Sequence, residues 1–165
     1  MKILENLAKF CAILAGILLT TITLMTCASV IGRETIGKTI TGDFELSGVA
    51  AGAAIALFMP WCQFKRGNIF VDFFTAKTSE KTQLNMERFG ASLLGVVMAV
   101  LTWRTVLGGL NAFNTNSGTM MLGFPEYVVY AAMVPPLALT ALIALNQAWY
   151  GFPTTGEDAN PELAV

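Results

Sequence analysis

The most constraining feature of this sequence is a run from Leu46 to Phe64 that contains no charged residue. As a helix, such a run has about the length needed to cross the ~30 Å hydrocarbon layer of a membrane. Acidic residues precede the run, and Lys65 and Arg66 follow it directly. Because basic residues collect on the cytoplasmic side of membrane spans, we expect a transmembrane helix over residues 44–64 with a cytoplasmic C-terminal end.

Three further apolar runs have the length of membrane spans. They cover about residues 10–32, 89–110 and 127–150. Charge followed by apolar residues could also indicate a signal peptide, but the first run is longer than a signal core and stays uncharged past Cys27. We therefore predict an all-α integral membrane protein, with one domain of four transmembrane helices over residues 1–150.

The basic residues set the expected orientation of the four helices. Of the ten Lys and Arg residues, seven fall at one end of the predicted spans and three at the other. By the positive-inside rule, both termini should be cytoplasmic. Residues 151–165 would then form a short cytoplasmic tail.

Aromatic residues near the cytoplasmic end are predicted to anchor the chain at the membrane interface. Phe70, Phe73 and Phe74 are spaced so that they share one side of a helical turn. Their segment, residues 65–88, is compatible with a short interfacial helix and equally with a loop packed on neighbouring spans. Trp149 and Tyr150 are the expected anchors at the end of the fourth span.

Small residues in the second span predict a contact with another helix. Gly48 and Gly52 stand four residues apart, with Ala56 next on the same face. Helices in lipid associate through such faces because small side chains allow the backbones to approach closely. We predict that these three residues form a helix interface.

A single arginine, Arg104, lies inside the third predicted span. An arginine at such a depth costs up to about 3 kcal/mol, unless it reaches water or pairs with an anion. Glu45 and Glu126 are candidate partners at the same membrane level, so a polar cluster near the outer face is one expectation. Snorkelling of the side chain to water is the other.

Several functions have no support in the composition. The chain has no histidine, the commonest general base and transition-metal ligand. Its cysteines, Cys11, Cys27 and Cys62, lie in apolar runs and form no C-x-x-C pair, so neither a zinc site nor a thiol-exchanging membrane enzyme is indicated. The basic residues are scattered and provide no surface for nucleic acid. We expect no catalytic site, metal or cofactor.

One motif is misleading. Gly32, Gly37, Lys38 and Thr39 match the G-x-x-x-x-G-K-[ST] pattern of phosphate-binding loops. That loop requires a preceding strand, a following helix and a magnesium-binding acid within an α/β domain. Here the match follows a membrane-length apolar run in a connector expected outside the cytoplasm, so we predict no ATP binding.

Taken together, the motifs resemble those of the small membrane subunit of tripartite ATP-independent periplasmic transporters. Arg33 follows the first span, Glu45 lies at the entrance of the second, and KRGNIFVD (residues 65–72) is similar to the family's R-x-G-H-I-x-V-D pattern. Residues 117–136 resemble its entry to the fourth span. Asn68 departs from the pattern, since the family usually has histidine there.

The resemblance implies a transporter subunit that catalyses no reaction. It implies a bacterial inner-membrane subunit that braces a large multispan subunit and assists docking of a periplasmic substrate-binding protein. Uptake of small organic acids would then be driven by an ion gradient, with membrane lipid as the surrounding partner. The alternative is an independent channel or carrier that forms a homo-oligomer.

Overall fold

The computed structural model describes residues 2–65 and 80–150, and this part of the chain is built from long helices. In order they are α1 (Lys2–Ile36), α2 (Asp43–Phe64), α4 (Glu80–Thr115) and α5 (Glu126–Tyr150). Each contains a stretch long and apolar enough to cross a membrane. The predicted all-α fold with four membrane-length helices is therefore confirmed, while the orientation of the termini stays a prediction.

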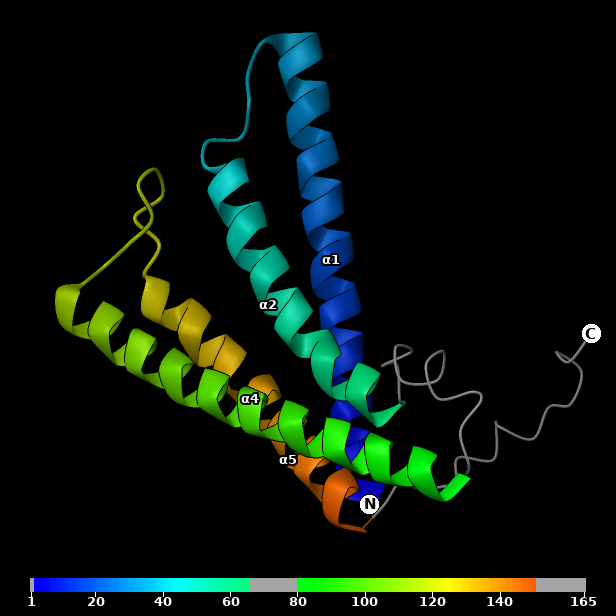
Figure 1. The fold of residues 1–165 in the computed structure, drawn as a ribbon. Helices are drawn as coiled ribbons and strands as arrows, with labels where there is room; N and C mark the ends of the chain where they lie inside the picture. Colours follow the sequence, from blue (N-terminus) through cyan, green and yellow to red (C-terminus); the bar gives the residue numbers. More distant parts are fainter. Residues whose placement is uncertain (1, 66–79, 151–165) are drawn as a thin grey trace, which may run out of the picture.

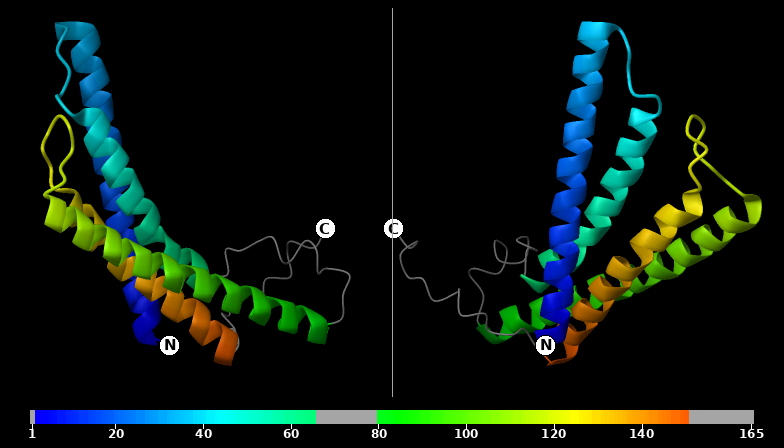
Figure 2. Two further views of the ribbon diagram at one scale, coloured as in Figure 1. Left: turned by 60° about the vertical axis from the view of Figure 1, so that its left-hand side comes forward. Right: turned by 180° about the vertical axis from the view of Figure 1, so that it is seen from behind.

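The helices form two antiparallel hairpins, α1 with α2 and α4 with α5 (Figure 1). The hairpins come together near the N-terminus of α1 and diverge toward the two connectors, as the rear view in Figure 2 also shows. Helix α5 contacts each of the other three helices. It is therefore the central element of the bundle.

Two apolar clusters join the hairpins. The first, near the end where α1 begins, contains Ala8, Phe64, Leu139 and Ile143. The second, further along, contains Ala56, Met98, Leu137 and Ala141. Most other large apolar side chains are exposed, as expected for helices whose outer faces meet lipid and not water.

The connector between α1 and α2 depends on residues with left-handed backbone conformations. Gly37 (φ 68°) ends α1 and its N–H donates to the Arg33 carbonyl at 3.2 Å, while Gly42 (φ 80°) directly precedes α2. The hydroxyl of Ser29, a buried residue of α1, donates to the Asp43 carboxylate at the start of α2. These features position the start of α2 beside α1.

Helices α1 and α4 are longer at both ends than the membrane spans predicted for them. The third span was predicted to end at about residue 110, and α4 continues to Thr115. Likewise α1 extends to Ile36, beyond the predicted end of its span. Polar residues can continue a helix outside the lipid, so a helix and its membrane span need not end together. The predicted short helix within 65–88 lies largely outside the described residues.

Candidate helix-contact site between the hairpins

An open cleft separates α2 from α5 where the hairpins diverge. Its volume is about 330 Å³, and α2 contributes two glycines and a valine to its wall. The lining residues are Gly48, Val49, Gly52, Glu126, Val129, Tyr130 and Met133. A largely apolar cleft inside a membrane protein can accept an apolar side chain from another helix or a lipid chain.

The predicted small-residue face is divided between this cleft and the core of the chain. Ala56 is buried (2% exposed) and packs with the second apolar cluster. A Cβ atom placed on Gly48 or Gly52 would meet no other atom within 4 Å. In the described part of the chain, therefore, nothing packs closely on these two glycines, and their role as a helix interface stays a prediction.

Other glycines provide the close helix packing that this chain does contain. A Cβ atom on Gly95 would lie 2.9 Å from the Leu145 side chain, and one on Gly109 would lie 3.0 Å from Tyr130 Cβ. Gly108 is similarly close to the Tyr130 ring. These α4 glycines allow α5 to approach and were missed in the sequence analysis, although the adjacent pair at 108–109 inside an apolar span was a usable signal.

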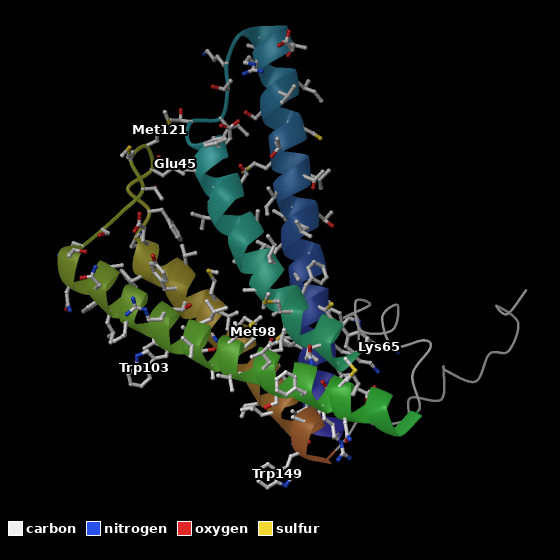
Figure 3. All side chains as sticks on the ribbon, in the orientation of Figure 1. Glu45, Lys65, Met98, Trp103, Met121 and Trp149 are labelled. Carbon is white, nitrogen blue, oxygen red and sulfur yellow. The ribbon has the colours of Figure 1, made fainter. Side chains whose placement is uncertain are left out.

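Glu45, one of the predicted site residues, binds the connector between α4 and α5. Its carboxylate accepts hydrogen bonds from the N–H of Met121 at 2.9 and 3.1 Å and from the N–H of Leu122 at 3.3 Å. Figure 3 shows Glu45 at the start of α2 and Met121 beside it at the tip of the connector. The connector is thus tethered to the start of α2, at the end where the hairpins diverge.

The tethered connector has an ordered internal structure. The Thr119 N–H donates to the Phe124 carbonyl at 3.0 Å, and the Gly123 N–H donates to the Thr119 carbonyl at 2.9 Å. Its tip is apolar and exposed, with Met120 fully exposed and Met121 70% exposed. Backbone hydrogen bonds therefore hold two methionine side chains away from the rest of the chain.

Packing at Gly42 reinforces the tether. A Cβ atom on Gly42 would lie 2.5 Å from Leu122 Cγ, so the leucine occupies the space that a side chain would need. Gly42 is buried although it lies in a connector. The two connectors therefore contact each other at the same end of the bundle.

Arg104 was predicted to lie near Glu45 and Glu126. Arg104 is exposed, and no ion pair joins it to Glu45 or Glu126 in residues 2–65 and 80–150. Glu45 binds backbone N–H groups instead, while Glu126 lines the cleft. Whether Arg104 pairs with an anion or snorkels to water was left open from the sequence, and the polar cluster with Glu45 stays a prediction.

At the closed end of the bundle, a buried pair of amides joins α2 to α5. The Gln63 side chain donates to Gln147 Oε1 at 2.7 Å, and the Gln147 amide donates to the Gln63 carbonyl at 3.2 Å. Both glutamines are 4% exposed. Sequence analysis missed them because a glutamine near the end of a span is usually assigned to the interface.

The predicted interfacial anchors are only partly described. Trp149 is 83% exposed and projects from the end of α5 (Figure 3), as an interfacial tryptophan should. The side chain of Tyr150 and all of Phe70, Phe73 and Phe74 lie outside the described residues.

The described residues contain no group of three Cys, Asp or Glu side chains that could hold a metal ion. Cys27 and Cys62 are exposed and Cys11 is half-buried, all as free thiols. The element before the apparent phosphate-binding motif is helix α1, not a strand, and the Lys38 N–H donates back to the Gly32 carbonyl at 3.4 Å.

The sequence of this chain matches a known protein family. The family model "Tripartite ATP-independent periplasmic transporters, DctQ component" matches residues 22–154. The match covers most of the chain, including the cleft, the tethered connector and the amide pair. Searches of curated proteins and of solved structures gave no significant match.

Proposed function

We propose that this chain braces a larger membrane subunit through the cleft between its hairpins. The chain belongs to the DctQ component family of tripartite ATP-independent periplasmic transporters. The family consists of transporter components, not enzymes. The chain is accordingly the small membrane subunit of such a transporter. A large membrane subunit and a periplasmic binding protein are the partners that this family implies.

The cleft is the observation that supports bracing. Gly48 and Gly52 expose helix backbone in it, whereas the next turn of α2 is already packed through Ala53, Ala54 and Ala56. Exposed backbone at two glycines four residues apart favours a neighbouring helix, because close approach is the main source of helix association in lipid. A helix of the large subunit would place a side chain in the cleft.

The finer parts of the proposal concern energy and substrate. A transporter that does not use ATP requires another source of energy, and we propose an ion gradient across the bacterial inner membrane. We propose small organic acids as the substrate class and cytoplasmic termini for this chain. The exposed connector tip with Met120 and Met121 would then face the periplasm, where it could assist docking of the binding protein.

Replacement of Gly52 by leucine tests the bracing surface. The leucine would fill the cleft without meeting an atom of this chain at its Cβ, so the fold should be retained. Overpacking of an interface costs about 1–3 kcal/mol, so we expect recovery of the large subunit with the tagged chain to fall about 10-fold or more, and uptake to fall with it.

Gly90→Leu in α4 is the matched control, since its Cβ would also meet nothing within 4 Å. It should leave recovery and uptake close to those of the unaltered chain. Unchanged assembly and uptake with Gly52→Leu would show that the cleft is not the bracing surface.

A further inference from the structure

One face of α5 lines the cleft, and this face begins with an acidic residue. The α5 residues in the wall recur at intervals of three and four positions, and they are Glu126, Val129, Tyr130 and Met133. Residues at this spacing lie on the same side of an α-helix. Glu126 is the first residue of α5, which begins at the end where the hairpins diverge (Figure 1). The wall thus combines one acidic residue with a largely apolar helix face.

The carboxylate of Glu126 is not used within the described chain. In residues 2–65 and 80–150 it accepts no hydrogen bond and joins no ion pair. Other acidic side chains near the connectors have partners, since Asp43 accepts a hydrogen bond from Ser29 and Glu45 binds the second connector. Glu126 is half-buried, and no lysine or arginine contributes to the cleft wall. The wall therefore includes an uncompensated negative charge.

The cleft has room for a long side chain from another protein. Its volume is about 330 Å³, and a Cβ atom on Gly48 or Gly52 would meet nothing within 4 Å. From Glu126 to Met133 the α5 wall extends about 10 Å along the helix axis, at 1.5 Å per residue. An extended lysine or arginine stem can therefore lie along Val129 and Met133 while its charged head reaches Glu126.

A neighbouring helix would change the surroundings of this carboxylate. If the large subunit covers the cleft, it excludes water from the wall. A carboxylate that loses water without gaining a partner is strongly unfavourable. An apolar side chain in the cleft would leave Glu126 in that condition, whereas a basic side chain would pair with it. Charge complementarity therefore favours a basic occupant.

We propose that a lysine or arginine from a transmembrane helix of the large subunit occupies the cleft and pairs with Glu126. This inference rests on the proposed bracing function and adds the chemistry of the partner. The aliphatic stem would pack on Val129 and Met133, and the two glycines of α2 would leave space for the helix that carries it. The ion pair would fix the register of that helix against this chain.

Replacement of Glu126 by glutamine tests the charge. The carboxylate has no partner among the described residues, so thermal unfolding of the purified full-length chain should stay close to that of the unaltered chain. Recovery of the large subunit with the tagged chain should fall about 10-fold or more, because the basic side chain loses its charged acceptor. Glu34→Gln removes an exposed carboxylate outside the cleft and should change recovery less than about 2-fold.

Photocross-linking in native membranes locates the opposite charge. Benzoylphenylalanine takes the place of Val129, about one turn from Glu126, and the adduct is identified by mass. The expected adduct is a peptide of the large subunit with a lysine or arginine within about one helical turn of the attachment point. Glutamate at that basic position should abolish recovery, and Glu126→Lys should restore it in the combined variant.

The outcomes separate the basic partner from bracing itself. An adduct without a nearby basic residue, unchanged recovery in Glu126→Gln, or failure of the charge exchange would overturn the basic partner. If Gly52→Leu still lowers recovery in those cases, the bracing surface remains supported. An adduct with lipid alone, together with unchanged recovery in Gly52→Leu, would overturn both.

Discussion

The carboxylate of Glu45 and the backbone N–H of Met121 are hydrogen-bonded across 76 positions of sequence, at 2.9 Å to Oε1 and 3.1 Å to Oε2. This contact links the start of α2 to the connector between α4 and α5. It joins the two hairpins at the end where their helices diverge (Figure 1). The bundle is thus held at both ends, by apolar clusters and glutamines at one and by this tether at the other.

Replacement of Glu45 by alanine should release the connector. The carboxylate holds both N–H groups, and solvent screens this exposed contact, so amide exchange at Met121 and Leu122 should accelerate by up to about 10-fold. Hydrogen exchange with mass spectrometry on the purified chain measures this change. Glu45→Gln, which keeps an acceptor oxygen, should have a smaller effect.

Ser47→Ala is the matched control for this tether. The Ser47 hydroxyl donates to the Phe44 carbonyl of its own helix at 3.0 Å, and among the described residues it makes no hydrogen bond to the connector. Exchange in the connector should stay unchanged in this variant. Slow exchange at Met121 in Glu45→Ala would contradict the role given to the carboxylate.

Gly42 and Gly37 permit a comparison of two left-handed glycines. Alanine at either position should cost about 1–2 kcal/mol because of its positive φ. Only at Gly42 would the added Cβ displace Leu122, so only Gly42→Ala should also loosen the connector. Thermal unfolding and hydrogen exchange separate the two effects.

Combination of Gly42→Ala with Leu122→Ala checks this explanation. Removal of the leucine side chain removes the clash, so Gly42→Ala added to Leu122→Ala should cost only the backbone term that Gly37→Ala also shows. A double variant in which the two losses simply add would show that Gly42 acts through some other contact.

The buried glutamines should be coupled. In a double-mutant cycle with Gln63→Leu and Gln147→Leu, we expect a coupling free energy of about 0.6 kcal/mol, the average found for hydrogen bonds between transmembrane helices. The measurement is the free energy of unfolding in mixed detergent. The control cycle combines Thr140→Val with Gln147→Leu. No coupling is expected there, because the Thr140 hydroxyl donates to the Pro136 carbonyl of its own helix at 2.8 Å. Zero coupling between the glutamines would contradict the account.

Hydropathy predicted the membrane-length helices because lipid permits few other structures in an uncharged run such as Leu46–Phe64. It could not locate the helix ends, because polar residues such as Asn111 and Thr115 continue α4 beyond the apolar run. The divergence of the hairpins was also beyond sequence reasoning, since it depends on how side chains from separate helices fit together.

The candidate site illustrates the same limit. The spacing of Gly48, Gly52 and Ala56 identified one helical face, but its division between core and cleft depends on the position of α5. Glu45 was singled out as an acidic residue at the entrance of a span, and an arginine was the obvious partner. The structure instead pairs it with backbone N–H groups of a distant connector, which no local pattern announces.

The most direct test of the central claim is mild detergent extraction of the tagged chain from its native membrane, with mass identification and quantification of copurifying proteins. If this chain braces a transport subunit, a much larger multispan protein should be recovered at equal stoichiometry. Recovery of this chain alone, as a defined homo-oligomer that conducts solute, would contradict the account and favour an independent channel or carrier.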